Sequence, residues 1–210
     1  MLTVALPKGR IAEETLEIFE QIFGTTFRFD DRKLILEADG FRFLLVRNQD
    51  VPAYVLHQSA DIGVVGLDVL EEKDEDLLRL LDLGIGKCKV CVGIQEGKEI
   101  DYSAPELKVA TKMTHIAQKY FSKKAMAVEI IKLYGSIELA PLVGLSDVIV
   151  DIVETGSTMK QNGLKVVETI LESSAYLIAN KNSFIEKKEE ITSLYHQIHT
   201  VIQSKAKQKA

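Results

Sequence analysis

The chain has 210 residues, of which 46% are hydrophobic and 27% are charged, and its formal net charge is -5. This length and composition can bury a substantial core in one or two domains. The negative net charge argues against a nucleic-acid-binding surface, which needs a large basic patch to displace counterions. Apolar stretches fall far short of the ~20 residues that span a membrane, and the N-terminus lacks a signal-peptide layout, so we expect a cytoplasmic protein with no membrane contact.

The first elements are a strand at residues 2–6 and an amphipathic helix from about residue 11 to residue 23. Between them, Lys8 and Arg10 flank Gly9 in a turn. Open α/β sheets bind their ligands at the carboxyl ends of their strands, where these two cations would suit a polyphosphate. The alternative is a solvated basic turn.

Strands and helices continue to alternate, which is typical of an α/β protein. We expect strands at residues 34–36, 41–46, 61–65, 89–94, 107–111, 128–131, 148–152 and 175–179. We expect helices at residues 51–57, 66–72, 114–123, 138–142 and 183–204. The acidic cluster at residues 71–76 and the basic tail at residues 205–209 are interpreted as solvated. No Pro/Gly/Ser-rich linker divides the chain, so two lobes would be joined by crossing strands.

Cys88 and Cys91 form a CxxC pattern, which occurs in redox pairs and zinc sites. No second CxxC or suitably spaced His pair accompanies it. In a strand, residues three apart face opposite sides of the sheet. We therefore interpret the two cysteines as structural.

The most informative segment is DVIVDIVETGSTMKQNGL at residues 147–164. Its β-branched run predicts a buried parallel strand, and Gly156 allows a tight turn before a helix-like continuation. The hydroxyls and N–H groups of residues 155–158, with a helix dipole behind them, predict an anion site. Asp151 and Glu154 would repel a bare phosphate but would suit the hydroxyls of a sugar or a magnesium ion. The segment thus indicates a phosphorylated sugar, and the alternative is a polar loop with a capping Thr or Ser.

Five segments in order along the chain resemble the ATP phosphoribosyltransferase family, which opens histidine biosynthesis. They are residues 6–11 (LPKGRI), 30–34 (DDRKL), 46–55 (VRNQDVPAYV), 60–70 (ADIGVVGLDVL) and 151–164 (DIVETGSTMKQNGL). The resemblance implies an α/β, two-lobed fold like that of type II periplasmic binding proteins, with two crossing strands. Domain I would comprise residues 1–90 and 177–210, and domain II residues 91–176.

The resemblance also implies an enzyme, a glycosyltransferase that moves the 5-phosphoribosyl group of phosphoribosyl pyrophosphate to N1 of ATP and releases pyrophosphate. The reaction inverts the configuration at C1 of the ribose. Alignment of the two substrates and stabilisation of the leaving pyrophosphate by Mg²⁺ and cations would supply the catalysis. We name no general base, and the four histidines of the chain suggest none.

Roles for individual residues follow from the same resemblance. The 5-phosphate would lie against Glu154, Thr155, Gly156, Ser157 and Thr158, with Asp151 and Glu154 near the ribose hydroxyls. Lys8, Arg10 and Arg32 would be the catalytic cations that face the pyrophosphate or the ATP phosphates. Residues assigned to ATP are Arg47, Asp50, Asp61 and Gly66, and Lys112 and Thr114 are candidate polar groups near the donor. Substrate phosphates would carry the Mg²⁺.

The chain resembles the short form of the family, which works with a separate regulatory subunit related to histidyl-tRNA synthetase. We expect a homodimer alone, a hetero-oligomer with that subunit, and inhibition by histidine only in the hetero-oligomer. Two alternatives remain open. One is a two-lobed binding protein without chemistry, since fold does not decide function. The other is a phosphoribosyltransferase that uses a free base.

Overall fold

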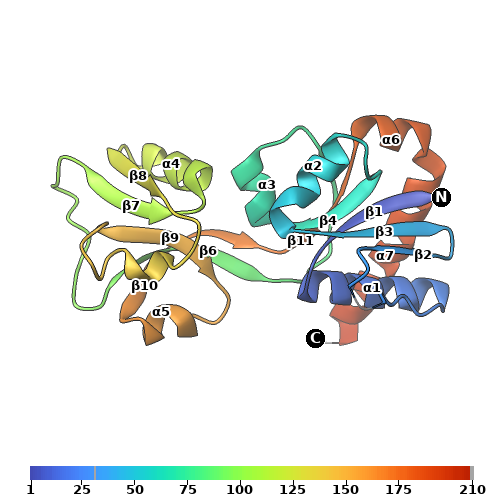
Figure 1. Ribbon diagram of the computed structural model, residues 1–210, viewed down its shortest axis with the longest axis horizontal. Helices are drawn as coiled ribbons and strands as arrows, with labels where there is room; N and C mark the ends of the chain where they lie inside the picture. Colours follow the sequence, from blue (N-terminus) through green and yellow to red (C-terminus); the bar gives the residue numbers. More distant parts are fainter. Residues whose placement is uncertain (31, 209–210) are drawn as a thin grey trace. The chain divides into compact units, whose positions relative to one another are not determined.

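The computed structural model describes residues 1–30 and 32–208. Asp31, which belongs to one of the five family segments, and Lys209, in the basic tail, lie outside the described residues. The chain divides into two compact units. Unit 1 comprises residues 1–86 and the chain from Ser174 onward, and unit 2 comprises residues 87–173 (Figure 1).

Unit 1 is built on a six-stranded sheet with the order β2-β3-β1-β4-β11-β5. The strands are β1 (Leu2–Pro7), β2 (Ile35–Ala38), β3 (Phe41–Val46), β4 (Ile62–Gly66), β5 (Leu78–Asp82) and β11 (Ala175–Ala179). Strands β3, β1 and β4 are parallel, whereas β2, β11 and β5 are each antiparallel to the strand they pair with. The carboxyl ends of three neighbouring strands therefore meet at one edge of this sheet.

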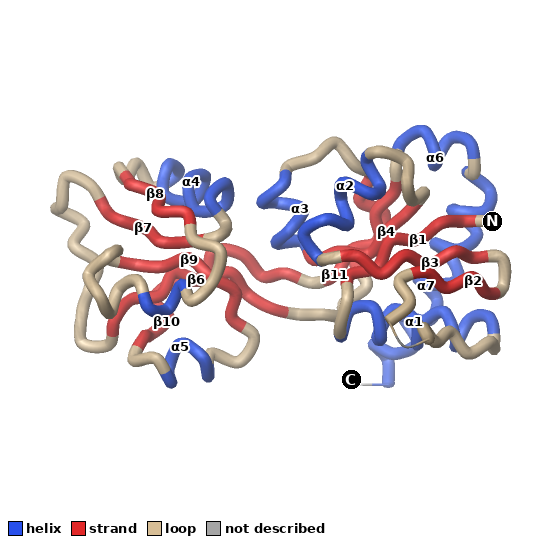
Figure 2. Tube along the Cα trace, in the orientation of Figure 1, coloured by secondary structure: helices blue, strands red, loops and turns tan. Residues whose placement is uncertain are grey.

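Helices cover both faces of the unit 1 sheet (Figure 2). They are α1 (Arg10–Phe23), α2 (Val51–Leu56), α3 (Leu67–Lys73), α6 (Lys181–Glu186) and α7 (Lys188–Gln208), with a short 3-10 turn η1 (Asn48–Asp50) before α2. Successive residues of β1 face opposite sides of the sheet. Val4 packs in the core beneath α1 and α7, and Ala5 packs in the core beneath α2 and α3. Phe19 of α1 is fully buried and packs edge-on against Phe41 and Phe43.

Gly63 of β4 lies where α2 packs closely onto the sheet. A Cβ at this position would lie 2.8 Å from Val55 Cγ2 and 3.2 Å from the Ala5 carbonyl oxygen. We expect Gly63→Ala to lower the free energy of unfolding by about 1–3 kcal/mol through overpacking, measured by urea denaturation. Gly135→Ala is the control because a Cβ there meets no atom within 4 Å. Equal stabilities for the two variants would contradict this account.

Unit 2 is built on a five-stranded sheet with the order β10-β6-β9-β7-β8. Its elements are β6 (Cys88–Gln95), β7 (Leu107–Thr111), α4 (Thr114–Lys123), β8 (Val128–Lys132), η2 (Ile137–Leu139), β9 (Val148–Val153), α5 (Ser157–Gln161) and β10 (Leu164–Ser173). Strands β8, β7 and β9 are parallel, and β6 and β10 are antiparallel to their partners. Helix α4 covers one core, and η2 and α5 cover the core on the other face.

The structure corrects several predicted elements. The expected final helix is two helices, α6 and α7, and the expected helix at residues 138–142 is the shorter turn η2. Strands β5 and β10 were not predicted. The cluster at residues 71–76 begins within α3 rather than in a loop, and Glu71 pairs with Arg79 at 2.6 Å. Asp76 pairs with Lys181 at 2.5 Å and remains 81% exposed, as expected for a solvated acid.

The predicted domain boundaries cut through β6 and β11, yet each of these strands pairs within one sheet along its length. The contacts divide the chain a few residues earlier, after Gly86 and after Ser173. As predicted, Cys88 and Cys91 lie on a strand, β6. Within the described part of the chain, no helix is both long and apolar enough for a membrane span.

Candidate functional site

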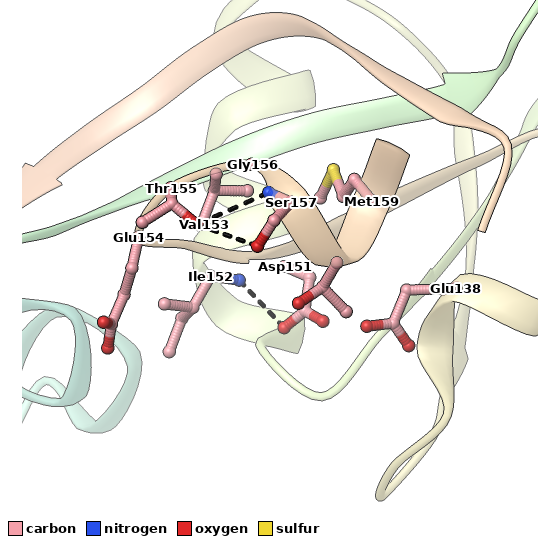
Figure 3. Close-up of a pocket in the computed structure, with 10 residues that line it drawn as sticks. Glu138, Asp151, Ile152, Val153, Glu154, Thr155, Gly156, Ser157 and Met159 are labelled. Carbon is pink, nitrogen blue, oxygen red and sulfur yellow. Dashed lines mark hydrogen bonds between the residues drawn. The ribbon is translucent and has the colours of Figure 1, made fainter. Parts of the chain in front are cut away.

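A pocket of about 400 Å³ opens in unit 2 at the carboxyl end of β9 (Figure 3). We call it the β9 pocket. Its lining residues are Glu138, Asp151, Ile152, Val153, Glu154, Thr155, Gly156, Ser157, Thr158 and Met159. Asp151 and residues 154–158, which the resemblance assigned to the phosphoribosyl donor, therefore share one surface, whereas the further candidates Lys112 and Thr114 do not line it.

The turn at the mouth of the pocket depends on Gly156. This residue has φ +79°, in the left-handed region, and caps the N-terminus of α5. The hydroxyls of Thr155 and Ser157 lie 2.9 Å apart, and the Ser157 N–H points to Thr155 Oγ1 at 3.4 Å. Hydroxyls and first-turn N–H groups therefore gather in one turn, as an anion site requires.

Helix α5 is shorter than the helix-like continuation that the sequence indicated. It ends at Gln161, and β10 begins at Leu164. A helix of about one turn has few aligned peptide units and so a weak macrodipole. Anion binding at this turn would therefore depend on local N–H and hydroxyl donors more than on a helix dipole.

Asp151 lies inside β9 rather than after it, opposite Cys91 of β6. Its carboxylate accepts a hydrogen bond from the Ile152 N–H at 2.8 Å. Glu154 follows the end of β9, and Figure 3 shows its side chain pointing away from Asp151. The two acids line the same pocket from different directions.

Burial raises the pKa of the Asp151 carboxyl above its ordinary value, although the Ile152 N–H and the Lys112 ammonium oppose the rise. The Glu138 carboxylate, which points toward Asp151 in Figure 3, adds to it. Lys112 Nζ lies 3.6 Å from Asp151 Oδ1. Sequence reasoning missed Glu138, because a lone acid in a short irregular segment carries no signal of its own.

The cations predicted for the pyrophosphate gather at one edge of the unit 1 sheet. Lys8 follows β1, and its N–H donates to the Val46 carbonyl oxygen at the end of β3 at 2.9 Å. Arg10 opens α1, and its Nε lies 3.5 Å from Glu14 Oε1. Arg32, with φ 61°, precedes β2, whose first residues pair with the end of β3. All three side chains belong to exposed residues.

Three residues predicted for ATP are at the same edge. Arg47 follows β3 and caps η1, and Asp50 is the last residue of η1. Gly66 ends β4 and caps α3. These residues belong to unit 1, whereas the β9 pocket belongs to unit 2.

Asp61 differs from the other residues predicted for ATP, because it precedes β4 at the opposite edge of the sheet. Its buried carboxylate accepts hydrogen bonds from the Thr3 N–H at 2.8 Å and from Lys187 Nζ at 2.7 Å. It thus ties the start of α7 to β1 and β4. We correct its assignment from nucleotide binding to a structural ion pair.

Residues 47–200, well over half of the chain, match the protein family described as HisG: ATP phosphoribosyltransferase. The chain belongs to the ATP phosphoribosyltransferase family. The ATP phosphoribosyltransferase of Wolinella succinogenes is 72% identical over 197 residues, which cover 94% of this chain and 96% of the relative. That of Helicobacter hepaticus is 67% identical over 205 residues, which cover 98% of this chain and 100% of the relative.

The solved structures agree with this membership. A chain of the ATP phosphoribosyl transferase (HisG:HisZ) complex from Thermotoga maritima superposes with a TM-score of 0.85 at 34% identity, covering 97% of this chain and 100% of that chain. The periplasmic aliphatic sulphonate binding protein SsuA from Escherichia coli superposes with a TM-score of 0.63 at 12% identity, covering 99% of this chain and 74% of that chain. At such low identity the second likeness concerns the fold alone.

The comparisons confirm the predicted family and the two-lobed α/β fold like that of type II periplasmic binding proteins. They also confirm the prediction of an enzyme, a glycosyltransferase of the ATP phosphoribosyltransferase class that acts at the first step of histidine biosynthesis.

Proposed function

We propose that this chain transfers the 5-phosphoribosyl group of phosphoribosyl pyrophosphate to N1 of ATP, with release of pyrophosphate. One observation supports this most strongly. A chain with near-full-length similarity to ATP phosphoribosyltransferases places Asp151 and the turn Glu154-Thr155-Gly156-Ser157-Thr158 around one pocket.

In this proposal the β9 pocket holds the donor. Hydroxyl and N–H groups of residues 155–158 bind the 5-phosphate, whose negative charge they match. Asp151 and Glu154 accept hydrogen bonds from the ribose hydroxyls, which are donors that a carboxylate suits. The pocket thereby fixes C1 of the ribose relative to the attacking nitrogen, and such alignment supplies much of the catalysis.

The edge of the unit 1 sheet holds the more highly charged phosphates. Lys8, Arg10 and Arg32 face the pyrophosphate or the ATP phosphates, and Arg47, Asp50 and Gly66 contact ATP. Positive charge placed where the leaving group gains negative charge stabilises the transition state. Displacement at C1 by a ring nitrogen needs little covalent assistance, and we assign no general base.

We propose Mg²⁺ as the cofactor, carried by the substrate phosphates. Among the described residues, no group of three or more His, Cys, Asp or Glu side chains could hold a metal ion by itself. In this proposal the substrate phosphates supply the ligands, because Mg²⁺ commonly binds proteins together with substrate phosphates and retains several water ligands. When bound, Mg²⁺ would neutralise part of the charge of the pyrophosphate.

We also propose a hetero-oligomer of the short form. This chain covers all of a chain of the Thermotoga maritima HisG:HisZ complex, which supports a separate regulatory subunit, in our proposal one related to histidyl-tRNA synthetase. Alone, the protein would form a cytoplasmic homodimer that is insensitive to histidine. Full inhibition of the purified chain by histidine would refute this arrangement.

Arg32→Ala is expected to lower kcat about tenfold or more with little change in the KM for phosphoribosyl pyrophosphate. Loss of a cation that acts on the leaving group raises the free energy of the transition state more than that of the bound ground state. Lys33→Ala is the control, because Lys33 lies in the same turn but pairs with Asp30 at 2.6 Å. Steady-state kinetics measure both variants. Equal kcat values for parent and Arg32→Ala would remove Arg32 from the site.

The reaction is tested by incubating the pure chain with ATP, phosphoribosyl pyrophosphate, Mg²⁺ and pyrophosphatase. Mass spectrometry should detect the phosphoribosyl adduct of ATP. Free adenine in place of ATP should give no adduct, and an adenine adduct would favour a free-base phosphoribosyltransferase. Absence of any adduct, with and without the regulatory subunit, would favour a binding protein.

A further inference from the structure

Lys112 lies beside the β9 pocket without any role in the proposal above. It is the first residue after β7, which runs parallel to β9 with Thr111 in register with Val150. The parallel register therefore brings Lys112 next to Asp151, and Lys112 Nζ lies 3.6 Å from Asp151 Oδ1. The Asp151 side chain is 14% exposed and the Lys112 side chain 34% exposed, so solvent screens this ion pair only partly.

The backbone on both sides of Lys112 is fixed by a buried residue. Thr111 has no exposed surface, and its hydroxyl donates to the Val150 carbonyl oxygen at 2.7 Å. The same hydroxyl oxygen accepts a hydrogen bond from the Met113 N–H at 2.9 Å. Thr111 thus ties the segment that carries Lys112 to the strand that carries Asp151, so the ion pair rests on two rigid elements.

The charges around Asp151 show why a cation matters there. Three carboxylates, those of Glu138, Asp151 and Glu154, line the pocket, and none of its lining residues in the described chain is a lysine or an arginine. The buried thiol of Cys91 is a further titratable group, on the residue of β6 that pairs with Asp151. A phosphorylated sugar would enter a negative pocket, and Glu138 disfavours the ionised form of Asp151.

We propose that Lys112 is a positioning residue for the phosphoribosyl donor, whose ammonium orients the Asp151 carboxylate to accept hydrogen bonds from the ribose hydroxyls. This inference rests on the proposed function of the β9 pocket. Lys112 itself acts through Asp151 rather than on the reacting atoms. The positive charge of Lys112 also offsets part of the repulsion between the pocket carboxylates and the donor phosphate.

Three variants test the proposal. Lys112→Met removes the charge and keeps much of the side-chain length, and Lys112→Arg keeps the charge. Lys108→Met is the matched control, because Lys108 lies on the same strand β7 but pairs with Glu129 at 3.8 Å.

Calorimetry with ribose 5-phosphate measures donor-site binding without catalysis. We expect Lys112→Met to weaken binding about tenfold or more, because the pocket becomes more negative and the Asp151 carboxylate loses the cation that orients it. Lys112→Arg and Lys108→Met should bind within about threefold of the parent. In steady state, Lys112→Met should raise the KM for phosphoribosyl pyrophosphate more than it lowers kcat.

Carbon-13 NMR of the aspartate carboxyls gives a second readout, with the Asp151 signal assigned by its absence in Asp151→Asn. Without Lys112, the midpoint of the Asp151 titration should move to higher pH, because an opposing charge has been removed. An unchanged midpoint, or ribose 5-phosphate binding within twofold of the parent in Lys112→Met, would overturn the proposal.

The two proposals fail differently. If the parent chain and its regulatory subunit form no ATP adduct, the proposed function fails, while calorimetry and NMR still decide whether Lys112 acts on a sugar-phosphate site through Asp151. If the adduct forms but Lys112→Met behaves like Lys108→Met, the function stands and the role of Lys112 is refuted.

Discussion

Gly156→Val is expected to raise the KM for phosphoribosyl pyrophosphate by about tenfold to a hundredfold. Gly156 has φ +79°, a backbone conformation that costs a β-branched residue about 1–3 kcal/mol. Space is not the obstacle, because the nearest atom to an added Cβ is Val153 Cγ1 at 3.9 Å. The turn would relax toward negative φ and move the donors of residues 155–158 away from the 5-phosphate.

Gly97→Val provides the matched control. Gly97 also belongs to unit 2 and has φ +84°, with no atom within 4 Å of an added Cβ. Both variants should lose similar stability, and only Gly156→Val should lose affinity for the donor. Thermal denaturation and steady-state kinetics measure the two effects. Parent-like kinetics in Gly156→Val would show that this turn does not hold the donor.

Asp151→Asn is expected to lower kcat/KM for phosphoribosyl pyrophosphate by about tenfold to a hundredfold. The substitution keeps the shape of the side chain but removes charge-assisted hydrogen bonds, each worth about 1.5–3 kcal/mol. In the parent, kcat/KM should fall as pH decreases through the raised pKa of Asp151, and this acid limb should be absent in the variant. An unchanged acid limb would assign it to another group.

The same substitution should increase stability at neutral pH. Burial raises the pKa of Asp151, so the folded protein binds a proton more readily than the unfolded chain does. The ionised carboxylate therefore destabilises the fold, increasingly as pH rises from the ordinary aspartate pKa of about 3.9 through the raised value. Asp151→Asn should melt above the parent near pH 7, and the difference should vanish below pH ~3.9. A lower melting temperature near pH 7 would contradict this sign.

Local signals predicted the elements that carry the candidate site. The β-branched run of β9, the glycine of the following turn and the amphipathic α1 each have a strong pattern in the sequence. Parallel strands then bring Lys8, Arg47 and Gly66 to one sheet edge. The hydrophobic pattern of the sequence was thus enough to predict the fold and the location of most site residues.

Other features depend on contacts that no local pattern shows. Strand β10 mixes apolar and polar residues, most of them at least partly exposed, and it pairs with β6 with two irregularities in the register. Asp61 lies in a segment typical of the family, but its carboxylate is bound to Thr3 and to Lys187, which is 126 residues away in sequence. Glu138 in η2 and Lys112 after β7 both act on the charge of Asp151. Tertiary contacts decide each of these positions.

The position of β11 has a consequence for the order in which the protein matures. Unit 2 is one continuous segment, whereas the sheet of unit 1 needs β11 between β4 and β5, and β11 is synthesised after all of unit 2. A nascent chain on the ribosome can therefore complete unit 2 while β5 still lacks its neighbour. The sheet of unit 1 is therefore completed only after β11 has been synthesised. Until then the unpaired edge of β4 is exposed and prone to aggregation.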